Sequence, residues 1–225
     1  MHYTEQLQKL LAGHADLQKA APMKAYMKDH FEFLGIKTPE RNTLLREFWK
    51  QTGMPEDNQL EAVVRELWSL PEREYQYAAM ALLDKYKKRI KPDSIILTEF
   101  LITEKSWWDT VDLLAGHHAG AYLAAFPEKR PELVRRWLDS DNIWLQRTAI
   151  LFQLKYKKQT DTALLFSIIE ELQESKEFFI RKAIGWALRE YAKTDSECVV
   201  SFVHSHALSP LSVREALKHA GKATG

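Results

Sequence analysis

Apolar residues recur along the chain at spacings of three and four, the pattern of amphipathic helices. One clear example contains Leu60, Val63, Val64, Leu67 and Trp68. No run alternates apolar and polar residues with the period of two that strands require. The pattern therefore predicts an all-α protein with roughly twelve to fourteen helices of about 8 to 18 residues.

Prolines and small polar residues mark the expected helix starts. Proline is tolerated in a first helical turn, and five prolines stand just before or within such turns: Pro39, Pro71, Pro92, Pro131 and Pro210. Candidate capping residues lie at further boundaries, since their side chains can accept hydrogen bonds from free backbone N–H groups. They are Thr38, Asp93, Ser106, Asp141 and Asp161.

A weak internal repeat organises these helices. Segments 74–86, 144–156 and 179–191 align without gaps, and their closing tyrosines are 70 and then 35 residues apart. Tyr122 closes the missing unit with a slip of one residue. Chance similarity in a helix-rich chain is the alternative, but the gapless match favours a repeat. A period near 35 with two helices per unit predicts a solenoid of HEAT-like helical pairs.

The repeat places three charged residues in one register. Asp112, Arg147 and Lys182 are spaced by 35 residues and occupy the same position of the second helix in successive units. Neighbouring helices lie roughly 8–10 Å apart, so we expect Asp112 and Arg147 to meet. Each charged residue has an indole about one turn away, at Trp108, Trp144 and Trp186 respectively. A row of charges and indoles predicts a concave binding groove.

Each of these residues also has a purely structural interpretation. Asp112 and Arg147 could form an ion pair that only ties two repeats together. Alternatively, Arg147 holds a phosphate or orients Asp112, and Asp112 stabilises a cationic transition state or aligns water. Trp108 and Trp186 either fill the core or form walls for a planar cation, at about 0.5–2 kcal/mol per contact. We assign Trp107 to the core.

Composition limits the partners and the compartment. The chain has 225 residues, 28% of them charged, and a net charge of +1, so a nucleic acid would have to meet a local basic surface. Basic clusters at 87–89, 135–136, 155–158 and 181–182 could grip two phosphate strands, although each is also typical of a solvated helix end. Trp49, Trp68 and Trp137 lack a charged register partner, and we assign them to the core.

Several other classes of function are not expected. The single cysteine, Cys198, excludes an internal disulfide and a cysteine metal cluster. The adjacent His117 and His118 point in different directions on a helix, and neither has a ligand four residues away. Phosphate-loop and dinucleotide motifs are missing from the sequence. The first 20 residues lack the apolar core of a signal peptide, and no stretch has the length of a membrane span. We expect an intracellular, reducing compartment.

Five separated motifs resemble the bacterial AlkD-type DNA alkylation repair glycosylases. They are the segments 23–26, 33–36, 106–112, 144–147 and 178–186. The resemblance spans roughly residues 1–220 and implies a single domain over residues 1–225. It further implies a right-handed superhelix of HEAT-like repeats whose concave face binds duplex DNA.

The same resemblance implies an activity and a site. Members hydrolyse the glycosidic bond of positively charged N3- and N7-alkylated purines, such as 3-methyladenine and 7-methylguanine, in base excision repair. Asp112 corresponds to the carboxylate beside the sugar, Trp108 and Trp186 to contacts with the lesion nucleotide, Tyr26 to a further wall, and Arg147 to a contact near the phosphate or the carboxylate. Lys182, from the repeat register, joins these as a candidate DNA contact.

The expected enzyme is monofunctional. An alkylated purine is already cationic, so neither a general acid, a metal, a nucleotide cofactor nor a lyase step is required, and we expect no cofactor. The expected partner is double-stranded DNA with alkylated bases, bound by a monomer in the bacterial cytoplasm and at the nucleoid during repair. The alternatives are a non-catalytic helical-repeat adaptor or DNA-binding protein, and an enzyme with a range shifted towards bulkier lesions.

Overall fold

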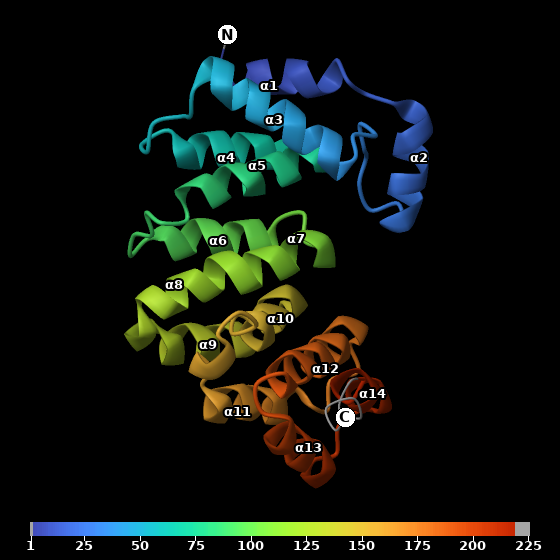
Figure 1. Cartoon of the computed structure of the whole chain (residues 1–225), viewed down its shortest axis with the longest axis vertical. Coiled ribbons are helices and arrows are strands. Elements are labelled where there is room, and N and C mark those ends of the chain that lie inside the picture. Colours follow the sequence, from blue (N-terminus) through green and yellow to red (C-terminus); the bar gives the residue numbers. More distant parts are fainter. Residues whose placement is uncertain (1, 219–225) are drawn as a thin grey trace. The chain divides into compact units, whose positions relative to one another are not determined.

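The computed structural model describes residues 2–218 and divides the chain into two compact units, Met1–Arg89 and Ile90–Gly225 (Figure 1). The N-terminal unit contains α1 (Tyr3–Ala12), α2 (Leu17–Tyr26), α3 (Thr38–Thr52), α4 (Leu60–Ser69) and α5 (Arg73–Tyr86). The expected single domain over residues 1–225 stays a prediction, and its ends, residues 1 and 219–225, lie outside the described residues.

The C-terminal unit begins with α6 (Ser94–Thr103), α7 (Trp108–Leu113), the π-helix η1 (Leu114–Ala119), α8 (Gly120–Ala125), the 3-10 turn η2 (Pro127–Lys129), α9 (Arg130–Leu138) and α10 (Ile143–Leu151). It continues with the 3-10 turn η3 (Lys157–Gln159), α11 (Thr162–Leu172), α12 (Phe178–Ala192), α13 (Ser196–Ser205) and α14 (Pro210–Ala216). Residues 2–218 contain no strand, only an isolated bridge between Glu32 and Glu72. The all-α prediction is confirmed.

Helix starts follow the predicted signals only in part. Asp161 caps α11 by accepting the N–H of Leu164 at 3.0 Å, as expected. At α10, however, the cap is Asn142 rather than Asp141, because the chain turns one residue later. Ser106 does not cap α7 either, since its hydroxyl donates to the carbonyl oxygen of Ile102 at 2.6 Å.

A buried carboxylate holds the N-terminal unit together. Glu74, on α5, is fully buried and accepts the backbone N–H groups of Leu34, Gly35 and Ile36 at 2.9–3.0 Å. Gly35 has a φ of +90°, and a Cβ there would lie 2.1 Å from the carbonyl oxygen of Asp16. Glycine is therefore required at this turn, and Glu74 fastens the segment after α2 onto α5.

Helix pairs in the C-terminal unit follow the 35-residue spacing. In Figure 1, α6 lies beside α7, α9 beside α10, and α12 against α10, α13 and α14. The closing tyrosines tie these helices together. The hydroxyl of Tyr122 donates to the carbonyl oxygen of Pro92 at 2.8 Å, and that of Tyr156 donates to Gly120 at 2.6 Å. Tyr191 accepts the hydroxyl of Thr162 at 2.9 Å.

The π-helix explains the slip of one residue in the repeat. Tyr122 follows Asp112 by ten residues, whereas Tyr156 follows Arg147 by nine. The segments α7, η1 and α8 run on as one helix, and the i→i+5 bonds of η1 absorb one extra residue. The tyrosine thus keeps its structural position although its sequence position shifts.

We predict that Gly120→Ala destabilises the protein by about 1–3 kcal/mol. A Cβ at Gly120 would lie 2.4 Å from the carbonyl oxygen of Phe152, a backbone atom that cannot rotate away. Gly116→Ala is the matched control on the same helix, because its Cβ would meet only Leu154, at 3.9 Å. We expect the control to stay within about 1 kcal/mol of wild type in urea unfolding. Equal losses in both variants would contradict this packing argument.

Candidate functional site

A buried ion pair joins α7 to α10. The Nε of Arg147 donates to Oδ1 of Asp112 at 2.7 Å, and its Nη2 donates to Oδ2 at 2.9 Å. A third N–H group, on Nη1, donates to the carbonyl oxygen of Phe179 at 2.5 Å. The Arg147 side chain is 5% exposed and that of Asp112 is 18% exposed. The contact expected from the repeat register is present, in bidentate geometry.

The environment of Asp112 opposes its charge. Burial raises the pKa of the Asp112 carboxyl above its ordinary value, and the charge of Asp109 raises it further. The hydrogen bonds and charge of Arg147 act in the opposite direction and lower this pKa. Arg147 therefore offsets part of the rise in the Asp112 pKa that burial causes.

Asp112 opens into a cleft of about 330 Å³. Two indoles line it: Trp108, the first residue of α7, and Trp186, on α12, both half-buried. The remaining lining residues are Asp109, Leu113, Gly116, His117, Leu154, Lys155 and Glu190. The lining carries three carboxylates and one lysine, but Asp112 is paired with Arg147 and Glu190 with Lys193. The two indoles are therefore the groups that favour a cationic ligand.

The consecutive tryptophans serve different surroundings. Trp107, with a φ of −159°, is the extended residue before α7. Its ring centroid lies 5.7 Å from that of Trp144 and 5.1 Å from that of Phe179, and these two rings are 4.9 Å apart. Trp107 therefore packs in a half-buried aromatic cluster and not in the core to which the sequence assigned it, while Trp108 lines the cleft.

The other predicted site residues do not line the cleft. Arg147 is bonded to Asp112 without lining it. Lys182 donates to Oε1 of Glu215 at 2.8 Å, and Arg189 donates to Oε2 of the same carboxylate at 2.6 Å. Tyr26 lies in the N-terminal unit, where it ends α2 with 69% of its surface exposed.

Seven of the residues that line the cleft were not among the site residues predicted from the sequence: Asp109, Leu113, Gly116, His117, Leu154, Lys155 and Glu190. Gly116 and His117 belong to η1, and the one-residue slip of the repeat was the signal that could have located that π-helix. Lys155 stood in a recognised basic cluster, whereas nothing in the sequence singled out Glu190. Within residues 2–218 no group of three or more His, Cys, Asp or Glu could hold a metal ion, and no helix is long and apolar enough to span a bilayer.

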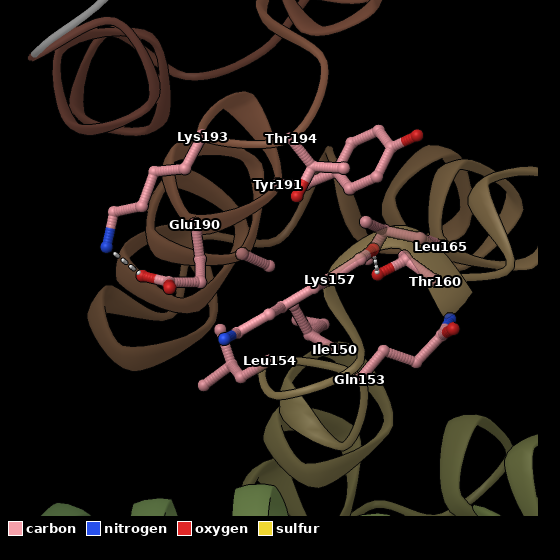
Figure 2. Close-up of a pocket in the computed structure, with 11 residues that line it drawn as sticks. Ile150, Gln153, Leu154, Lys157, Thr160, Leu165, Glu190, Tyr191, Lys193 and Thr194 are labelled. Carbon is pink, nitrogen blue, oxygen red and sulfur yellow. Dashed lines mark hydrogen bonds and ion pairs between the residues drawn. The ribbon is translucent and has the colours of Figure 1, made fainter.

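A second cavity adjoins the first, since Leu154 and Glu190 line both. It has a volume of about 220 Å³ and lies between residues 150–165 and α12 (Figure 2). Figure 2 shows the Glu190 carboxylate pointing towards Lys193, whose Nζ donates to Oε2 at 2.6 Å. This ion pair holds Glu190 at the boundary of the two cavities.

Residues 7–220 match the sequence profile of a family described as DNA alkylation repair enzyme. The chain belongs to this family. A solved structure described as a predicted DNA alkylation repair enzyme from Enterococcus faecalis is similar to it, with 33% identity, a TM-score of 0.85, and coverage of 93% of this chain and 98% of the other. No curated protein matched the chain. The resemblance drawn from the five motifs is confirmed, and the family places the cleft in a DNA repair enzyme.

We predict a pH-dependent contribution of Glu215 to stability. The hydrogen bond from Lys182, followed by that from Arg189, lowers the pKa of Glu215 from 4.5 to about 2. A lowered pKa stabilises the fold above pH 4.5, and this stabilisation is lost as the pH falls towards 2. The difference in unfolding free energy between wild type and Glu215→Gln should therefore be larger at neutral pH than near pH 2. Glu197→Gln, an exposed change on α13, is the control in urea titrations; a pH-independent difference would contradict the assignment.

Proposed function

We propose that the Asp112 cleft hydrolyses the N-glycosidic bond of cationic N3- and N7-alkylated purines in duplex DNA. The observation that carries this proposal is the Asp112 carboxylate, held on both oxygens by Arg147 and opening between Trp108 and Trp186. Membership of a DNA alkylation repair family indicates that the substrate is DNA.

The chemistry needs one well-placed anion. An alkylated purine already carries positive charge, so its glycosidic bond breaks without a general acid, and the bonding electron pair neutralises the departing base. Positive charge then develops on the deoxyribose, where a carboxylate in a poorly solvated cleft stabilises it strongly. Water adds its oxygen to C1′ and releases a proton. Asp112 can both stabilise this charge and orient the water.

Selectivity follows from the lining. Indole faces attract cations by about 0.5–2 kcal/mol per contact. Trp108 and Trp186 therefore favour a charged lesion over a neutral purine. Arg147 is a positioning residue in this proposal, because its N–H groups hold Asp112 and the carbonyl of Phe179. Tyr26 and Lys182 remain proposed DNA contacts outside this lining.

We predict that Asp112→Asn lowers the single-turnover release of 7-methylguanine from methylated duplex DNA by at least about 10²-fold. Asp139→Asn makes the same chemical change at an exposed carboxylate paired with Arg135 and should retain the wild-type rate. The Asn variant leaves the buried Arg147 charge uncompensated, at a cost of about 3–5 kcal/mol. Rates are therefore measured below the unfolding transition of both proteins, and an unchanged rate in Asp112→Asn would remove Asp112 from the mechanism.

We predict that Arg147→Lys moves the acidic limb of the pH–rate profile to higher pH. Loss of the bidentate pairing weakens the influence that lowers the Asp112 pKa, so the carboxylate protonates more readily. The salt dependence of DNA binding should not change, because the guanidinium is bonded within the fold. An unaltered profile with a shallower salt dependence would instead indicate a phosphate contact.

The second candidate function is a DNA-binding protein or adaptor without catalysis, which the same helical architecture could support. Base release from alkylated DNA, compared with binding of unmodified DNA, separates the two. Binding by the wild-type protein without any base release would favour the second candidate.

A further inference from the structure

A second cleft lies wholly within the N-terminal unit. It has a volume of about 400 Å³, and we call it the basic cleft after its four cationic lining residues. Arg46 and Lys50 stand one turn apart on α3, and Lys85 and Arg89 flank the C-terminal end of α5. The rest of the lining is Trp49, Met54 and Tyr86. Trp49 was assigned to the core from the sequence; that assignment is wrong, because it is half-buried and faces this cleft.

The charges of the basic cleft are poorly compensated. Arg89 donates to Asp57 at 2.5 Å, outside the lining. Arg46, Lys50 and Lys85 form no ion pair within residues 2–218. The Nη2 of Arg46 donates a hydrogen bond to the hydroxyl of Thr43 at 3.5 Å. Like charges one helical turn apart repel each other by roughly 0.2–0.5 kcal/mol. Four cations around one hollow therefore favour an anionic ligand.

The basic cluster at residues 135–136 is neutralised. Arg135 pairs with both Asp139 and Glu171 at 2.5 Å, and Arg136 pairs with Glu99 at 2.5 Å. Their guanidinium groups have carboxylate partners, and an added anion would have to displace them. The basic cleft differs because its lining contains no carboxylate.

Aromatic rings give the basic cleft a second recognition element. The Nζ of Lys85 lies 5.2 Å from the ring centroid of Trp49, and Cζ of Arg89 lies 5.3 Å from that of Tyr86. These contacts hold the cations over apolar surface. Cations that grip phosphate beside rings that accept a sugar or base are the combination used to bind nucleic-acid strands.

We propose that the basic cleft binds a phosphate group, and that this phosphate belongs to the DNA backbone. The second part rests on the proposed function, since it concerns the same DNA. The basic cleft then contributes affinity that depends neither on base sequence nor on the lesion, because phosphate contacts position a protein without reading bases.

The test uses unmodified duplex DNA and the full chain. In Lys50→Gln/Lys85→Gln we expect the slope of log K against log salt to fall by about 0.9 for each phosphate that is no longer neutralised, with binding weakened roughly tenfold per phosphate at 0.1 M salt. Arg135→Gln/Arg136→Gln is the matched control: it removes the same charge from residues that already have carboxylate partners. We expect its slope to stay at the wild-type value. Thermal unfolding of both variants confirms that the fold is retained.

A second arm identifies the source of the phosphate. Sodium phosphate is compared with sodium chloride at equal ionic strength in thermal unfolding. If phosphate stabilises the wild type but not Lys50→Gln/Lys85→Gln, while the DNA slope is unchanged, the ligand is a free phosphate and only the DNA assignment fails. If Lys50→Gln/Lys85→Gln and Arg135→Gln/Arg136→Gln behave alike in DNA binding and in thermal unfolding, the basic cleft is only a pair of solvated helix ends and the proposal is overturned.

The two proposals fail separately. If the wild type releases the base but the salt slope does not change in Lys50→Gln/Lys85→Gln, the phosphate site in the basic cleft is rejected and the proposed function is retained. If the slope falls in Lys50→Gln/Lys85→Gln but the wild type releases no base, the proposed function is rejected and the phosphate site is retained.

Discussion

The Asp112–Arg147 ion pair is the constraint on which the site depends. Burying both charges costs desolvation energy, which is offset only when the geometry is good and further donors are satisfied. Here both carboxylate oxygens are bonded, and the third guanidinium contact reaches the backbone of α12. One side chain thus connects three helices, α7, α10 and α12. The two indoles of the cleft lie on the first and last of these, so their separation depends on the same connection.

The extra residue of η1 gives this repeat a different surface from its neighbours. A one-residue insertion in a helix would normally rotate every later side chain by about 100°. The π-helix absorbs that rotation before Tyr122, which keeps its bond to Pro92. Gly116 and His117, which belong to this π-helix, line the cleft beside Asp112. The irregularity is therefore confined to the site, where π-helices are frequently found.

The two clefts are lined by different kinds of charged and aromatic groups. Two indoles and three carboxylates, two of them paired with Arg147 and Lys193, line the cleft at Asp112, whereas the basic cleft is lined by four cations and no carboxylate. Alkylated duplex DNA carries both kinds of charge: its backbone is negative along its whole length, and its base is positive only at the lesion. A protein of net charge +1 can meet both demands only by separating its charges into local surfaces. Under the proposed function, this separation lets a nearly neutral protein bind the DNA backbone in one place and a positively charged base in another.

The sequence by itself determined the helices, their 35-residue spacing and the meeting of Asp112 with Arg147, because these depend on periodicity and on equivalent positions of neighbouring helices. Only the tertiary structure decided which residues pair outside the 35-residue spacing and which way their side chains point. Lys182 pairs with Glu215 at a separation of 33 residues, outside the repeat register. Trp49 lines a cleft although it has no charged partner in that register. Local patterns show which helix face is apolar, but they do not show which neighbour covers it. That information exists only once the helices have packed.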